Sequence, residues 1–209
     1  LAHAHNCTLF MVVHAALAVL LARLTGDPDV AIGTPIAGRG HRALDDLVGM
    51  FVNTLTLRTR VEAATTFTEL IDHTRETDLA AFANADIPFE RVVEIVAPGR
   101  ATTHNPLFGV VLSFQNNEQP TLQLPGLTVT ALDTDTVAAK FDLQVNINPH
   151  HHDDGTPAHL DTIFTYATDL FDETTIHTLG HRLQRILTTI ATNPNTTIGD
   201  IDILDDTER

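Results

Sequence analysis

The sequence LFGVVLSFQN, residues 107–116, is the most informative stretch for the fold class. Its apolar residues follow one another without the alternation of a half-buried strand, which is typical of a central strand buried on both faces. Such strands occur in α/β proteins, where helices cover the sheet. The stretch therefore predicts an α/β fold with this strand inside the sheet.

The flanking sequence alternates between helix and strand patterns. Apolar residues on nearly every face predict a largely buried helix over residues 8–24, with a stop at Gly26. Thr66 and Glu69 have the spacing of a capping box, and Pro88 has the position typical of a helix start. We expect one α/β unit, with strands over residues 29–36, 53–61, 141–148 and 160–167 and a last helix over about 172–192.

The composition is that of a globular, strongly acidic chain. The 209 residues are 43% apolar, which is enough to bury one substantial core. The 12 Lys and Arg against 27 Asp and Glu give a net charge of −15, so neither nucleic acid nor a membrane is expected as a partner. Cys7 is the single cysteine and the start of the chain shows no signal-peptide pattern, so we expect a cytoplasmic protein. Because residue 1 is Leu and not Met, we expect a piece of a longer polypeptide.

The histidine-rich segment PHHHDDGTP, residues 149–157, is the first candidate for chemistry. In an extended chain His150 and His152 point to the same side, and the aspartates after them offer further zinc ligands. The alternative is a hairpin, because Asp154-Gly155 is a typical turn dipeptide between two alternating strands. The flanking sequence provides neither a fourth ligand nor an orienting partner for a histidine base. We therefore favour a hairpin loop with solvated histidines and expect no metal site there.

Three ordered motifs lie along the chain. Residues 49–54 read GMFVNT, residues 86–90 read DIPFE, and residues 100–107 read RATTHNPL. Together they resemble the G-x-F-V-N-T, D-x-P-F-E and R-D-x-S-R-N-P-L patterns of the condensation domains of nonribosomal peptide synthetases. The first two match throughout, whereas the third has Ala, Thr and His where Asp, Ser and Arg are usual. The matching residues are Gly49, Phe51, Val52, Asn53, Thr54, Asp86, Pro88, Phe89, Glu90, Arg100, Asn105, Pro106 and Leu107.

The resemblance implies the fold and the place of the chain within it. Condensation domains are V-shaped and have two chloramphenicol acetyltransferase-like lobes, each with a mixed β-sheet packed with helices. Their catalytic H-H-x-x-x-D-G motif lies N-terminal to everything matched here, whereas HHHDDG is near the C-terminal end and has one residue too few. We therefore expect residues 1–209 to be the C-terminal half of such a domain, with a linker to the next domain starting at about residue 194. This lobe would hold no catalytic residue and would be inactive alone.

The resemblance also implies the reaction and the partners. In condensation domains the amine of an acceptor attacks the thioester carbonyl of a donor, and both substrates are tethered to phosphopantetheine arms of carrier domains. An α-amine titrates at roughly 7.7–8.0, so positioning can matter as much as proton removal. The implied partners are the N-terminal lobe, donor and acceptor carrier domains and an adjacent adenylation domain. No cofactor beyond the phosphopantetheine arms is expected.

Candidate substrate contacts follow from the implied tunnel between the lobes. Ser113 and Gln115 share one side of the central strand and Asn53 follows the G-x-F-V motif, so these three could line the tunnel wall. Asn53 and Ser113 could instead satisfy backbone groups, and DIPFE is more typical of a helix start with an aromatic core anchor than of a ligand contact. Arg39 and Arg42, on a glycine-rich loop, could meet a pantetheine phosphate or remain solvated.

Two other functions remain open. One is a noncatalytic module that docks carrier domains or acts as a scaffold, and carrier binding without turnover in the full-length parent would favour it. The other is an epimerisation or ester-forming domain of the same fold. The segment VVLSFQN resembles condensation members more than epimerisation members.

Overall fold

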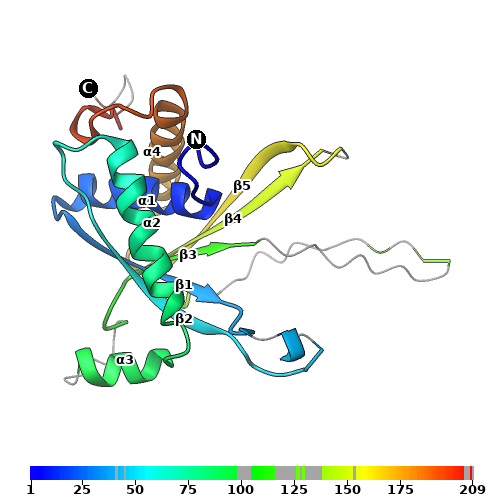
Figure 1. The fold of residues 1–209 in the computed structure, drawn as a ribbon. Coiled ribbons are helices and arrows are strands. Elements are labelled where there is room, and N and C mark those ends of the chain that lie inside the picture. The colour runs from blue at the N-terminus through cyan, green and yellow to red at the C-terminus, as the bar shows by residue number, and fades with distance from the viewer. Residues whose placement is uncertain are drawn as a thin grey trace.

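The computed structural model describes residues 1–40, 42–44, 46–97, 105–115, 126–127, 129, 138–152, 154–204 and 208. Within these residues the chain forms α-helices and one β-sheet (Figure 1). The helices are α1 (Leu9–Thr25), α2 (Phe67–Ala83), α3 (Phe89–Val96) and α4 (Glu173–Thr192). The strands are β1 (Asp29–Ile36), β2 (Asn53–Arg60), β3 (Val110–Phe114), β4 (Leu143–His151) and β5 (Pro157–Tyr166).

The sheet is mixed, with the strand order β2-β1-β3-β4-β5. β3 is parallel to both of its neighbours, whereas β2 and β5 at the edges are antiparallel to theirs. The predicted central strand is therefore confirmed, although it covers only Val110–Phe114. Val111 and Leu112 are 3% and 0% exposed, so both faces of β3 are covered.

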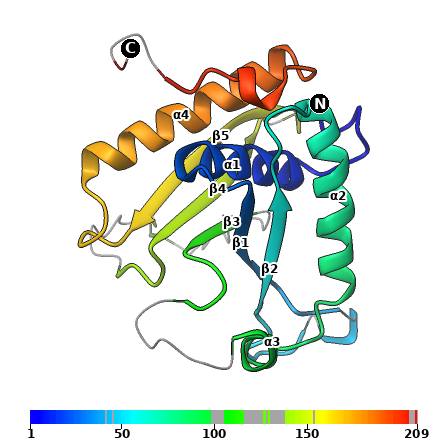
Figure 2. The ribbon, with the colours of Figure 1, turned by 90° about the vertical axis from the view of Figure 1, so that its left-hand side faces the viewer.

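Three long helices lie on one face of the sheet. α1 crosses the strands between α2 and α4 (Figure 2), and buried side chains of all three helices join one core with alternate residues of the strands. α3 lies apart from them, beyond the end at which β2 begins. None of the three long helices covers the opposite face, which leaves that face to other parts of the molecule or to a partner.

The ends of these helices follow from local chemistry. The Thr8 side chain accepts the amide of Met11 at the start of α1, and Gly26 ends this helix with a φ of 74°, which favours glycine. Thr66 and Glu69 form the predicted capping box of α2. Among the described residues, no helix combines the length and apolar character needed to cross a membrane.

The segment after α4, where we expected a linker to begin, packs into the same core as the helices and the sheet. Ile198 and Ile201 are 1% and 0% exposed, and Ile203 is also buried. The guanidinium of Arg23 donates to the carbonyl oxygens of Ile198, Gly199 and Ile201 at 2.9–3.1 Å. Because apolar burial and hydrogen bonds both hold this segment, the chain through Ile203 belongs to the folded unit.

Candidate functional site

A cavity of about 630 Å³ lies where the first two sequence motifs meet. Its walls come from the loop after β1, the start of β2, the end of α2 and the start of α3. These segments are distant in the sequence, so the sheet and the α2–α3 connection are what bring them together. The side chains around it include Arg39, Phe51, Asn53, Phe82, Phe89 and Glu90.

Asn53 joins the start of β2 to the connection between α2 and α3. Its Nδ2 donates to the carbonyl oxygens of Ala85 at 2.9 Å and Ile87 at 2.8 Å. Its Oδ1 accepts the amides of Thr54 at 2.9 Å and Phe89 at 3.1 Å. Both donors and both acceptor positions of the carboxamide are therefore used by backbone groups. This arrangement matches the structural alternative considered above for Asn53, and it places the residue in the cavity wall.

Gly38 and Arg39 hold the glycine-rich loop close to Phe51, which is part of the cavity wall. A Cβ on Gly38 would lie 1.7 Å from the carbonyl oxygen of Phe51, and its φ is 62°. The guanidinium carbon of Arg39 lies 4.3 Å from the centre of the Phe51 ring, and Arg39 also donates to the Leu44 carbonyl oxygen. Arg39 is thus engaged within the loop, whereas Arg42 is exposed at the start of a short 3-10 helix over Arg42–Leu44.

Aromatic rings connect the second motif to the third. Phe89 packs against Phe108 with ring centres 5.5 Å apart, and Phe108 packs against Phe141 at 5.9 Å. The Phe108 ring occupies the position of a side chain at Gly33, since a Cβ there would be 2.3 Å from it. Asn105 Oδ1 accepts the amides of Leu107 and Phe108 and shapes the turn before β3.

The remaining motif residues have mixed environments. Val52 is 58% exposed, Gly49 and Asp86 are also exposed, and Pro88 is the N-cap residue of α3. Arg100 lies outside the described residues. The DIPFE motif therefore provides a helix start at Pro88, as its alternative interpretation predicts, whereas Phe89 is half-buried and packs on Phe108 outside the main core.

A second polar group lies on the face of the sheet opposite the long helices. Ser113 of β3 is 6% exposed and pairs in register with Asn146 of β4. Gln144 Nε2 donates to Asn146 Oδ1 at 2.8 Å. The sequence interpretation named Ser113 and missed Gln144 and Asn146. The signal was present, because the alternation of FDLQVNIN places these two side chains opposite the buried Leu143, Val145 and Ile147.

Gln115 extends this polar group past the end of β3. Its amide donates to the carbonyl oxygen of Ile147 at 2.8 Å, which continues the pairing between β3 and β4, and its side chain is exposed. Strand alternation puts it on the same side as Ser113. Asn53 belongs to β2, two strands away, which is about 10 Å at the usual strand spacing. The three predicted wall residues therefore fall into two groups, Ser113 with Gln115 and Asn53 with the cavity.

The histidine-rich segment is a hairpin, as predicted. β4 and β5 are antiparallel, and Gly155 in the turn has a φ of 81°. The hydroxyl and the amide of Thr156 donate to Asp154 Oδ1, which holds the pKa of that carboxyl below its ordinary value. The expectation that the histidines lie in the loop was wrong for two of them, because β4 continues to residue 151 and includes His150.

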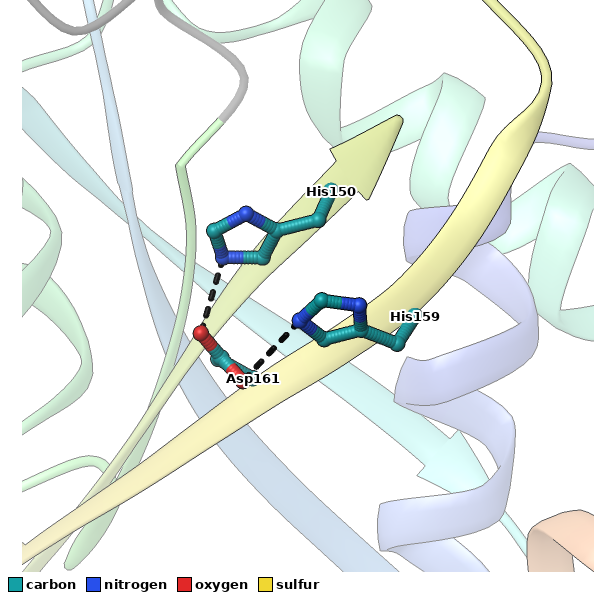
Figure 3. Close-up of side chains that lie close together, drawn as sticks. All are labelled: His150, His159 and Asp161. Carbon is teal, nitrogen blue, oxygen red and sulfur yellow. Dashed lines mark ion pairs between the residues drawn. The ribbon is translucent and has the colours of Figure 1, made fainter. Parts of the chain in front are cut away.

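The strand position of His150 brings it to residues that the sequence interpretation did not consider. His150 pairs in register with His159 of β5, and both rings lie next to Asp161 (Figure 3). Asp154 is instead used in the turn, and Asp153 lies outside the described residues.

Comparison with known proteins identifies the family. The sequence matches the Condensation domain family over residues 1–209, so the chain belongs to this family. It is 44% identical over 204 residues to a dimodular nonribosomal peptide synthase of Bacillus subtilis (strain 168), a match that covers 98% of this chain and 9% of the relative. It is also 44% identical over 209 residues to an isonitrile lipopeptide synthase of Mycobacterium tuberculosis (strain ATCC 25618 / H37Rv), which covers 100% of this chain and 8% of that relative. The chain thus spans less than a tenth of the length of these relatives.

Solved structures confirm the fold. The X-domain from teicoplanin biosynthesis superposes with a TM-score of 0.90 at 29% identity, covering 97% of this chain and 46% of that one. The first condensation domain of the calcium-dependent antibiotic synthetase gives a TM-score of 0.78 at 21% identity and covers 98% of this chain and 43% of that one. The fold is therefore of the chloramphenicol acetyltransferase-like type.

Proposed function

We propose that this chain is the C-terminal lobe of a condensation domain that forms a peptide bond between two carrier-bound thioesters, and that it supplies one wall of the substrate tunnel. The observation that carries the proposal is the placement of a polar group on the face of the sheet opposite the long helices. There the half-buried Asn146 and Gln144 lie beside Ser113, which is 6% exposed. The coverage of less than half of each structural neighbour is the coverage expected of one lobe of two.

The two lobes would have different roles in the reaction. The acceptor amine attacks the donor carbonyl, the thioester carbon–sulfur bond breaks, and the proton of the amine passes to a base while the donor thiol leaves. The base would be a histidine of the N-terminal lobe. This lobe would hold the pantetheine arm or the peptide in position, because the polar groups around Ser113 can hydrogen-bond amides, and such positioning lowers the barrier by several kcal/mol. Asn53 would act indirectly, by fixing the α2–α3 connection and the start of α3 beside the cavity.

A complementation experiment tests whether both lobes are needed for product formation. Donor and acceptor carrier proteins are loaded and mixed with this chain alone, with this chain plus the N-terminal lobe of its parent, and with the same pair after replacement of the upstream catalytic histidine. We expect product only with the intact pair, measured by mass spectrometry of the acceptor carrier. Product formed by this chain alone would overturn the proposal.

The tunnel wall is tested by a matched pair of glutamines in the complete domain. Gln115→Ala removes an exposed amide beside Ser113, whereas Gln184→Ala removes an exposed amide from α4 on the helix side. We expect slower condensation for the first variant only, with nearly unchanged melting temperatures for both. Normal turnover with a large loss of stability in Gln115→Ala would make Gln115 a structural residue.

A second candidate function is supported by one of the comparisons. The X-domain from teicoplanin biosynthesis was also solved in complex with OxyB, and this neighbour has a TM-score of 0.89 at 30% identity over 98% of this chain and 44% of that one. A domain of this fold can therefore bind a second protein. Carrier binding without product in the complete parent would favour such a noncatalytic docking role.

A further inference from the structure

The β4–β5 hairpin brings two histidines and an aspartate onto one face. His150 and His159 are directly opposite each other, and Asp161 is two residues beyond His159 on the same strand. Residues two apart on a strand share a face, so all three side chains project to the same side. That side is opposite the one on which Leu160 and Phe164 pack against the core. The three polar side chains are therefore exposed and turned away from the long helices.

The ligand atoms of these residues converge. His150 Nε2 lies 2.8 Å from Asp161 Oδ2, and His159 Nε2 lies 3.5 Å from Asp161 Oδ1 (Figure 3). The two imidazole rings are stacked, with centres 4.6 Å apart and an angle of 8° between their planes. One ligand atom from each residue lies within 4.8 Å of the others. Among the residues that the structure describes, this is the one group of three metal-ligating side chains with that property.

We propose that His150, His159 and Asp161 form a binding site for a divalent transition-metal ion of the Zn²⁺ class. A Zn²⁺ ion binds imidazole nitrogen and carboxylate oxygen at about 2.0–2.2 Å in a tetrahedron, which places neighbouring ligand atoms roughly 3.3 Å apart. The two nitrogen–oxygen separations, 2.8 and 3.5 Å, lie on either side of this value. Small rotations of exposed side chains would close the site, and two imidazoles favour Zn²⁺, Ni²⁺ or Cu²⁺ over Mg²⁺ or Ca²⁺.

Three protein ligands leave a fourth position for water or for a group from another molecule. The exposure of the ligands implies a modest, exchangeable affinity, because the free side chains must be ordered when the ion binds. The proposal departs from the sequence-based expectation of no metal, which considered only residues within the segment 149–157. It does not depend on condensation activity, and its test does not measure that activity.

The competing explanation is that the same residues form histidine–aspartate ion pairs and bind no metal. Zn²⁺ titration of the tag-free chain by calorimetry distinguishes the two, with His159→Ala and Asp161→Asn as site variants. His177→Ala is the matched control, because His177 is an exposed histidine of α4 that lies 3.7 Å from a single carboxylate, Glu173. Co²⁺ titration adds a second readout, since tetrahedral Co²⁺ absorbs visible light far more strongly than the hydrated ion.

We expect one Zn²⁺ per chain with a micromolar dissociation constant, unchanged in His177→Ala. In His159→Ala and Asp161→Asn the affinity should fall at least about tenfold, since even loss of an outer-shell partner commonly costs that much. Melting temperatures measured in EDTA show whether each variant is folded. If His159→Ala is poorly folded, Asp161→Asn still tests the site, because asparagine keeps the shape of the aspartate side chain. The proposal is overturned by equal affinity in the site variants and the parent, or by the lack of saturable binding in the parent.

Discussion

His14 of α1 and Asp78 of α2 form a hydrogen-bonded pair in which both side chains are fully buried, with 3.1 Å between Nδ1 and Oδ2. The other ring nitrogen, Nε2, lies 3.3 Å from the hydroxyl of Thr59 in β2. The pair therefore connects two helices and the sheet through polar groups inside an apolar core. Asp78 Oδ1 has no hydrogen-bond partner, so the aspartate depends on a single strong contact.

Replacing one member of this pair should destabilise the fold. Asp78→Leu leaves His14 Nδ1 buried without its partner, and His14→Leu leaves the Asp78 carboxyl group buried without its partner, so each should cost about 2–4 kcal/mol in urea unfolding. The double variant should be more stable than the sum of the two losses predicts, by about 1–3 kcal/mol. Additive losses would show that the two side chains do not interact.

Removal of the Asn53 carboxamide should loosen the cavity wall. Asn53→Ala removes four hydrogen bonds to backbone groups, and we expect a loss of about 2–4 kcal/mol of stability. Asn53→Asp keeps the acceptor for two amides but turns an oxygen toward two carbonyl oxygens. This variant should therefore be no more stable than Asn53→Ala. If Asn53 acts mainly on substrate, Asn53→Ala will instead lower turnover in the complete domain at unchanged stability.

Two glycines of one loop provide a matched test of the backbone around Arg39. Gly38→Ala forces a Cβ to 1.7 Å from the Phe51 carbonyl oxygen, whereas a Cβ at Gly40 meets no atom within 4 Å. Gly38→Ala should therefore lower the melting temperature by several degrees, and Gly40→Ala should leave it nearly unchanged. Equal melting temperatures for the two variants would contradict the close approach of this loop to Phe51.

The stability of the protein at acidic pH should depend on the N-cap residue of α4. The amide of Thr175 donates to Asp172 Oδ1 at 2.6 Å and lowers the pKa of this carboxyl in the folded state. Its contribution to stability is therefore present above the pKa of the unfolded chain, near pH 4, and is lost as the pH falls further. Asp172→Asn keeps a capping oxygen that does not titrate. This variant should lose less stability than the parent between pH 7 and about pH 3, as measured by denaturant unfolding at both values.

Features that depend on adjacent residues could be predicted from the sequence. Gly26 ends α1, Thr66 and Glu69 cap α2, and Gly155 turns the β4–β5 hairpin, as their local patterns indicate. The central position of β3 followed from its continuous apolar run. In each case the cause lies within a few residues, in a hydrogen bond, a left-handed backbone or a burial pattern.

Features that depend on which segments pair could not be predicted in the same way. Alternation showed that Gln144 and Asn146 share a face, but their position beside Ser113 depends on the parallel register of β3 and β4. His150 meets His159 because of the hairpin register, and a slip of one residue would turn one of them to the other face. The packing of Phe89 on Phe108 likewise joins segments with no local signal for contact.

The burial of α1 has a consequence for how the chain is made. α1 is covered in part by α4, although the two helices lie at opposite ends of the described chain. During synthesis the apolar side chains of α1 leave the ribosome long before residues 173–192 do, and chains are extended at only about 5–20 residues per second. For several seconds one side of this helix is thus open to water and to other nascent chains. Folding of this unit is completed only after residues 173–192 have left the ribosome, and a product that stops before α4 should aggregate.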